Sequence, residues 1–189
     1  MARVTAPERS RRADILSAAQ DEFAAAGYAG ARIERIAAAA AVNKQLLFHY
    51  FRSKDGLFTV ALEQLLERCE PSALSSGEQP ADTIRRLLAD LQAALRTMPG
   101  IAAIIADSAS NHGFPADAAT AVRLWRERLV ARLEHAMADG QRRGYFRDDL
   151  DPRTMAALAF AAALGDGASG DGGRPLPLGA LLVDYCAWR

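Results

Sequence analysis

A short stretch of the sequence, residues 43–58, carries side chains suited to noncovalent recognition. Lys44, Gln45 and His49 lie within two helical turns of one another. A cation, an amide and an imidazole at this spacing can hold phosphate oxygens and hydrogen-bond to base edges. No nucleophile with a general base beside it can be read from the chain. The pattern therefore favours binding of nucleic acid over catalysis.

Helix caps would hold these side chains in place. Asn43 is a strong N-cap residue, because its side-chain oxygen accepts from the free N–H groups that open a helix. A helix is predicted to begin at Lys44. Leu47 and Phe51 lie four residues apart and share the inward face, which leaves the polar side chains open to a partner. Ser53 is expected to cap the helix that follows.

The flanking residues complete a helix-turn-helix. Apolar residues at helical spacing predict a helix over 32–39, which about four residues join to the helix at Lys44. A first helix precedes this pair and is expected to end at Gly27 in a left-handed C-cap. A fourth helix over 53–69 is expected to lead out of the motif.

The motif resembles the DNA-binding domain of the tetracycline-repressor (TetR) family of bacterial transcription regulators over residues 9–58. The resemblance lies in Ile36-Ala37, Ala41-Val42-Asn43-Lys44, Leu47-Phe48-His49-Tyr50-Phe51 and Ser53-Lys54-Asp55-Gly56-Leu57-Phe58. The chain departs from the family pattern at Ala41, where Gly is usual and costs less if φ is positive. It also has Leu46 for Thr or Ser and Phe48 for Tyr, which removes two hydroxyl donors.

Phosphates are expected to be held by Lys44, Tyr50 and Lys54, and bases to be faced by Gln45, Leu46 and His49. The full set of predicted DNA-binding residues is Arg32, Asn43, Lys44, Gln45, Leu46, Phe48, His49, Tyr50 and Lys54. An N-terminal arm either reaches a minor groove or flanking phosphates, or is simply a solvated end; its cations are Arg3, Arg9, Arg11 and Arg12.

The distribution of charge supports this surface, although the net charge is zero. Residues 1–54 hold nine basic and five acidic residues, a balance of +4, and residues 55–189 hold fourteen and eighteen, a balance of −4. The chain's two lysines, Lys44 and Lys54, fall in the first turns of predicted helices, where a cation opposes the helix dipole. A phosphate partner explains that placement, and two solvated lysines are the plainer alternative.

The remaining chain is helical in pattern and lacks alternation with a period of two, so an all-α fold of about nine helices is predicted. Further helices are expected over 84–95, 101–111, 115–143 and 153–164, with a last one around 178–185. The predicted domains are a helix-turn-helix DNA-binding domain, 1–53, and a ligand-binding and dimerisation domain, 54–189.

The resemblance implies that the middle helices of the second domain enclose a small-molecule effector and that the last two helices pair with a second subunit. The Ala-rich helix over 153–164 suits close helix packing, although burial within one monomer is the alternative. An apolar or amphipathic ligand is expected, and plain core packing is the alternative for its lining. The candidate ligand-binding residues are Leu91, Leu95, Met98, Ile105, His112, Trp125, Leu129 and Phe160.

No cofactor and no metal is expected. The run 165–170 matches G-x-G-x-x-G, but it follows a helix and too little chain remains for a dinucleotide-binding unit. Asp148, Asp149 and Asp151 lack the pattern of a calcium loop and instead suit the start of the following helix.

The expected location is the cytoplasm, without a membrane partner. No apolar run approaches the ~18 residues needed to cross a bilayer, and the N-terminus lacks the apolar region of a secretory signal. Cys69 and Cys186 are expected to be reduced, buried thiols.

The sequence thus predicts a non-enzymatic, homodimeric, ligand-responsive repressor of a near-palindromic operator. Two alternatives stay open. One is an activator, or a DNA-binding protein without an effector. The other is a helical small-molecule-binding protein or enzyme with a non-functional helix-turn-helix, which Leu46 and Phe48 would favour.

Overall fold

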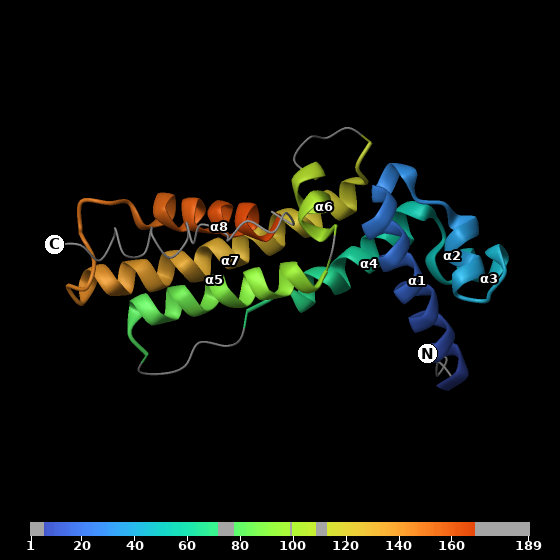
Figure 1. Ribbon diagram of the computed structural model, residues 1–189, viewed down its shortest axis with the longest axis horizontal. Coiled ribbons are helices and arrows are strands. Elements are labelled where there is room, and N and C mark those ends of the chain that lie inside the picture. Colours follow the sequence, from blue (N-terminus) through green and yellow to red (C-terminus); the bar gives the residue numbers. More distant parts are fainter. Residues whose placement is uncertain (1–5, 72–77, 99, 109–112, 169–189) are drawn as a thin grey trace. The chain divides into compact units, whose positions relative to one another are not determined.

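A computed structural model describes residues 6–71, 78–98, 100–108 and 113–168, with side chains for most of them. This part of the chain forms eight helices and no strands (Figure 1). The predicted all-α class is confirmed. The ninth helix expected near residues 178–185 lies outside the described residues.

The helices group into two compact units. The first contains residues 1–67 and 98–122, and the second contains residues 68–97 and 123–189. The long helix α7 (Ala116–Arg142) contributes residues to both. The domain boundary after residue 53 remains a prediction.

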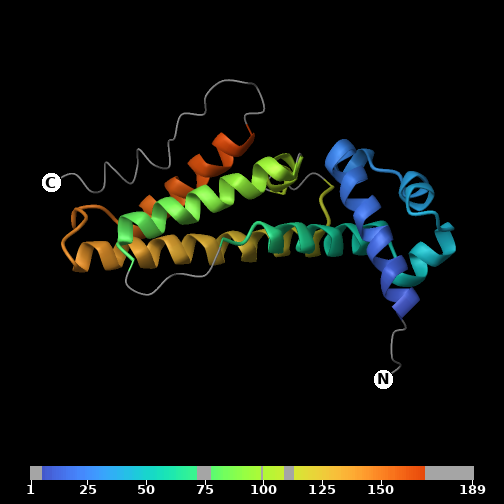
Figure 2. The ribbon, with the colours of Figure 1, turned by 60° about the horizontal axis from the view of Figure 1, so that its bottom comes forward.

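The first unit is built on α1 (Ala6–Gly30), whose buried face carries Ile15, Ala19 and Phe23. The unit also holds α2 (Ile33–Ala39), α3 (Lys44–Phe51), nearly all of α4 (Lys54–Arg68), and α6 (Ile101–Asp107). Helices α1 and α2 are in contact, as are α2 and α3, and Figure 2 shows the two short helices beside α1. The three predicted helices of the helix-turn-helix region are therefore present.

Gly27 interrupts α1 but does not end it, which corrects the expected left-handed C-cap. Its φ of +66° combines with a ψ of 177°, a conformation open essentially to glycine alone. The chain kinks there and makes one further turn to Gly30. Just beyond the kink Tyr28 stacks on Phe23, with ring centroids 6.5 Å apart.

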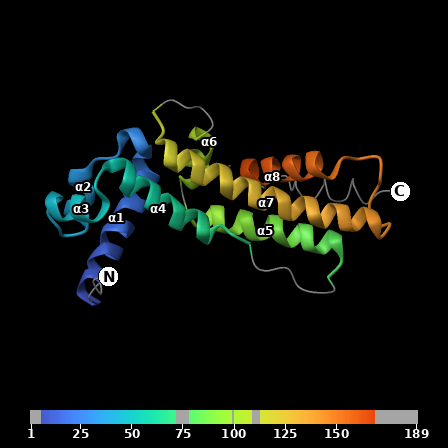
Figure 3. The same ribbon diagram turned by 180° about the vertical axis from the view of Figure 1, so that it is seen from behind.

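The second unit contains α5 (Pro80–Thr97), most of α7, and α8 (Pro152–Ala168). Helix α5 packs along α8, and Figure 3 shows both beside α7. Trp125 of α7 and Phe160 of α8 meet edge to face at 5.6 Å in the core of this unit.

Two helices extend beyond their predicted bounds. Helix α5 spans Pro80–Thr97, whereas 84–95 was predicted, and proline is well suited to its first turn. Helix α8 runs on to Ala168, past its predicted end at residue 164. Its last turn thus takes in the beginning of the G-x-G-x-x-G run.

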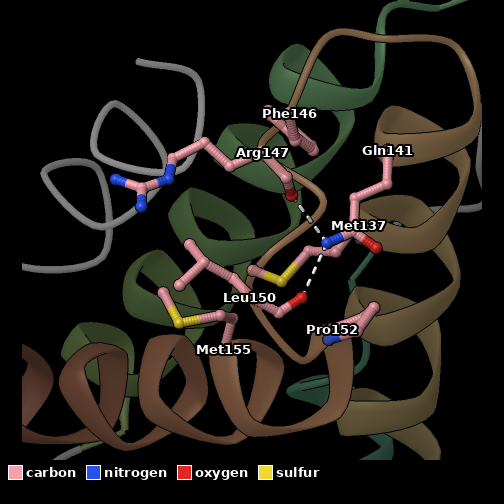
Figure 4. A pocket seen from close by; sticks show the side chains of 7 residues that line it. All are labelled: Met137, Gln141, Phe146, Arg147, Leu150, Pro152 and Met155. Carbon is pink, nitrogen blue, oxygen red and sulfur yellow. Dashed lines mark hydrogen bonds between the residues drawn. The ribbon is translucent and has the colours of Figure 1, made fainter. Parts of the chain in front are cut away.

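The connection between α7 and α8 is fixed by polar contacts around a small pocket (Figure 4). The Gln141 side-chain amide donates to the backbone carbonyls of Arg147 and Leu150, each at 2.7 Å. Asp151 caps α8 by accepting from the Thr154 hydroxyl at 2.5 Å and from the Thr154 N–H at 2.8 Å, and these bonds hold the pKa of its carboxyl below the usual value. The predicted place of Asp151 at the start of this helix is confirmed.

The turn between α3 and α4 is unusually tight. Ser53 Oγ accepts from the Gly56 N–H at 3.0 Å, as expected of the cap of α4. A Cβ atom at Gly56 would lie only 2.5 Å from the Phe51 carbonyl oxygen, so a larger residue would force the two helices apart. Glycine at this position is a steric requirement.

We predict that Gly56→Ala lowers the free energy of unfolding by about 1–3 kcal/mol, because the Phe51 carbonyl is backbone and cannot turn away. Thermal or urea unfolding measures this loss. Gly30→Ala is the matched control, since its Cβ atom would meet only the Ala26 Cβ atom at 3.4 Å. Equal effects of the two substitutions would contradict the steric argument.

Candidate DNA-binding surface

The start of α3 has the predicted cap. Asn43 Oδ1 accepts from the Leu46 N–H at 2.8 Å. The turn before it contains Ala41 with a φ of +52°, the positive value that makes glycine the cheaper residue there. The side chain of Asn43 is therefore engaged within the fold and serves to orient α3.

Helix α3 separates a buried face from an open one. Leu47 and Phe51 are buried, at 0% and 5% exposure. Gln45 and His49 are exposed. The other candidate base- and phosphate-contacting residues of this helix are Leu46 and Tyr50, which are half-buried, and Phe48, which is 39% exposed. The open face thus carries the polar side chains that the sequence placed there.

Lys44 already has an ion-pair partner. Its ammonium donates to Glu34 of α2, and this hydrogen bond lowers the pKa of the Glu34 carboxyl. Both side chains are more than half exposed, so water screens the pair and its exchange for another anion costs little. Lys44 is thus available to a phosphate, although not unpartnered.

Lys54 lies against the end of α1. Its Nζ atom is 4.8 Å from the Tyr28 ring centroid and donates to the Ala29 carbonyl at 3.4 Å. The Tyr28 hydroxyl donates to Asp55 at 2.5 Å. Burial, with help from that bond and the Asp55 charge, raises the pKa of Tyr28 to about 12. These contacts join the start of α4 to α1 and orient the Lys54 ammonium.

The arginines around α3 differ in their surroundings. Arg12 lies over the Phe51 ring at 5.3 Å, and Arg35 pairs with Glu22 at 3.8 Å. Arg11, Arg32 and Arg52 are exposed, and none of them has an ion pair with a described residue. Of the remaining cations of the predicted arm, Arg3 and the side chain of Arg9 lie outside the description.

A second candidate site is an apolar pocket of the second unit. It brings together three of the predicted ligand-binding residues, Leu91, Leu129 and Phe160. Its enclosed part admits little more than one water molecule. The lining residues that sequence reasoning did not select are Pro71, Leu87, Leu88, Arg132 and Leu133. Leu87 and Leu88 continue the apolar stripe of Leu91, and this was the available signal.

The other predicted ligand residues are not gathered there. Leu95 is buried on α5 but does not line this pocket, and Met98 and Ile105 belong to the first unit. His112 lies outside the described residues. Trp125, one turn before Leu129, is fully buried, and its indole N–H has no hydrogen-bond partner among the described residues.

Three further findings concern metal sites, reactive thiols and membrane-spanning helices in the described ranges. They contain no group of three His, Cys, Asp or Glu side chains placed to hold a metal ion. Cys69 is a buried free thiol whose pKa burial raises to about 11, and Cys186 lies outside the description. No single helix among the described residues is both long and apolar enough to span a membrane.

A capped short helix with an open polar face, set by a tight turn beside a second short helix, defines a helix-turn-helix DNA-binding protein. Residues 15–61 match the family model for bacterial regulatory proteins of the tetR family. Residues 80–168 match the model for the tetracyclin repressor-like C-terminal domain.

Relatives match over most of the chain. It is 34% identical to the HTH-type transcriptional repressor SCO4008 of Streptomyces coelicolor over 160 residues, which are 83% of this chain and 78% of that protein. It is 30% identical to the HTH-type transcriptional repressor NicS of Pseudomonas putida over 142 residues, which are 74% and 67% of the two chains.

Solved structures share the fold. A mutant of HlyIIR superimposes with a TM-score of 0.76 at 18% identity, covering 96% of this chain and 97% of that one. AibR, in complex with isovaleryl coenzyme A and operator DNA, gives a TM-score of 0.72 at 20% identity, with 93% and 95% covered.

The chain therefore belongs to the TetR family of bacterial regulatory proteins. It is a DNA-binding transcriptional regulator, as the sequence predicted. The two relatives matched by sequence, SCO4008 and NicS, are transcriptional repressors.

Proposed function

We propose that this regulator is a homodimeric repressor that binds a near-palindromic operator and is released from it by a small apolar molecule. Residues 1–53 bind DNA, and residues 54–189 bind the effector and the second subunit. The observation that carries the proposal is the capped helix α3, whose exposed face presents Gln45 and His49. In a symmetric dimer two such helices enter successive major grooves about 34 Å apart.

The DNA contacts divide into two kinds. Lys44, Lys54 and Tyr50 bind phosphates, together with free N–H groups at the start of α3. Gln45 and His49 face bases, with Leu46 and Phe48 offering apolar contact to thymine methyl groups. Arg32, exposed just before α2, adds a phosphate contact, and Asn43 contributes by holding the start of α3.

Substitutions should separate these two kinds of contact. Lys54→Ala should weaken binding to every duplex about equally and reduce the slope of log affinity against log salt by about 0.9 per subunit. Gln45→Ala or His49→Ala should instead cost about 1–3 kcal/mol on the operator and relax base preference. Gel-shift titrations with the DNA upstream of the gene and with a mixed-sequence duplex measure both effects.

Thermal unfolding of each variant is the control, because Lys54→Ala also loses its contacts with Tyr28 and Ala29. An affinity and a salt slope both unchanged in Lys54→Ala would remove Lys54 from the phosphate contacts. A wild-type protein that bound neither duplex would overturn the proposed function.

The dimer interface is assigned to α8 and the chain beyond it. One face of α8, with Ala156, Ala159 and Phe160, is buried within the second unit. Ala157 and Ala161 on another face are exposed, and Leu158 beside them is 49% exposed. Small side chains around one exposed leucine allow another helix to approach closely, which supports pairing with a second α8.

Ala161→Glu should convert the dimer to a monomer at micromolar concentration and abolish tight operator binding, because a carboxylate would be buried without a partner. Sedimentation velocity measures the change. Ala161 is preferred to the half-buried Ala162, where the substitution would also strain the subunit itself. Ala89→Glu on the exposed face of α5 is the matched control and should stay dimeric. A wild-type monomer that bound a two-half-site operator tightly would contradict this assignment.

The effector site is assigned to the apolar pocket between α5, α7 and α8. The pocket admits little more than one water molecule, so an effector must widen it and thereby favour a different conformation of the second unit. Trp125 does not line the pocket, but it packs on the lining residue Phe160. Its unpartnered N–H favours a ligand whose hydrogen-bond acceptor reaches it once the pocket widens, because a buried donor left unsatisfied costs about 1–3 kcal/mol. Effector and DNA then weaken each other's binding by the same factor.

We predict that effectors change the fluorescence of Trp125. Trp188→Phe removes the second tryptophan and isolates this signal. In a screen of apolar and aromatic metabolites, compounds that release operator DNA should shift the emission over the same concentration range. Releasing compounds that leave the emission unchanged would make Trp125 a purely structural residue.

A further inference from the structure

The turn that ends α3 places an arginine in a conformation that suits glycine. Arg52 has a φ of +64° and a ψ of −46°. The Ser53 N–H donates to the Phe51 carbonyl at 2.7 Å across it, closing a three-residue turn. This is a classic γ-turn, a rare and strained form for a residue with a side chain.

The side chain of Arg52 forms no contact that would account for this strain. Arg52 is exposed, and its guanidinium makes no hydrogen bond, ion pair or ring contact with any described residue. Glycine would adopt the same backbone without the cost. Strain kept although the side chain makes no such contact within the described part of the chain suggests a role in binding.

The position of Arg52 fits a DNA backbone. Lys44 is the first residue of α3 and Arg52 directly follows its last, so the rise of the helix separates their Cα atoms by about 12 Å. The major groove is about 12 Å wide. A helix of this length seated in the groove therefore has a cation at each end, near the phosphates on either side.

The electrostatics of the helix favour the same arrangement. The C-terminal end of α3 carries a partial negative charge from its unpaired carbonyls, which would repel a phosphate. A cation held immediately after that end offsets the repulsion. Arg52 has a guanidinium with several donors, which suits bidentate binding of phosphate oxygens.

We propose that Arg52 binds an operator phosphate at the C-terminal end of α3, and that its strained turn aims the side chain at that phosphate. This inference rests on the proposed DNA-binding function of α3. The proposed contact with the phosphate depends on the charge of Arg52 and does not distinguish one base from another.

The test compares two glycine substitutions that relieve positive φ at the two ends of α3. Arg52→Gly removes strain and charge together, whereas Ala41→Gly removes strain alone, since Ala41 has a φ of +52°. Each should raise the Tm by about 2–4 °C. Arg52→Lys keeps the charge and the strain. The probe is a 30-base-pair duplex of mixed sequence, because a phosphate contact does not depend on an operator.

Binding of that duplex should be weakened several-fold by Arg52→Gly, with the slope of log affinity against log salt reduced by about 0.9 per subunit. Ala41→Gly should leave affinity and slope unchanged, and Arg52→Lys should keep most of the slope. A raised Tm with unchanged affinity and slope in Arg52→Gly would overturn the phosphate contact. A lowered Tm would overturn the strain argument. Wild-type protein that bound no duplex would overturn the proposed function as well.

Discussion

The carbonyl of Phe51 is the constraint on which the DNA-binding surface depends. It accepts from the Ser53 N–H and lies where a side chain of Gly56 would begin. The last turn of α3 and the first turn of α4 are therefore locked together by backbone atoms that have no freedom to move aside. Since Leu47 and Phe51 anchor the inner face of α3, the outer face is fixed at the same time.

The short length of α3 explains why residues with strained backbone conformations lie at both of its ends. A helix of only eight residues needs abrupt turns at both ends, and these fall on Ala41 and Arg52, the non-glycine residues with positive φ in the described chain. The unfavourable backbone is tolerated because Asn43, Ser53 and the buried side chains hold both turns in place. The two strained turns lower local stability, but they fix the orientation of α3, which a short DNA-binding helix requires.

The second unit uses its helices differently. Helix α8 is alanine-rich on several faces, and the unit buries one of them against α5 while another stays exposed. Burial within the subunit, one of the two interpretations that the sequence left open, holds for one face of this helix. The surface that we propose for a partner helix is the exposed face. The unpartnered Trp125 N–H lies in the core of this unit, where a polar group is costly unless something binds it.

The sequence by itself determined the elements with strong local signals. Asn43, Ser53 and Asp151 cap helices where predicted, and the all-α fold followed from apolar spacing. These features depend on residues within one helical turn of each other, which is the range that a sequence pattern records. The prediction at Gly27 was wrong because glycine can adopt several conformations with positive φ. The one found here kinks the helix and does not end it.

Only the tertiary structure decided how the side chains are partnered. Lys44 pairs with Glu34, ten residues away, and Lys54 packs on Tyr28 from another helix. The pocket collects Leu91, Leu129 and Phe160 from three helices and leaves out Leu95 of the same stripe. Helical periodicity says which side of a helix is apolar, but which apolar residues border a pocket depends on how neighbouring helices pack, and that information is not local.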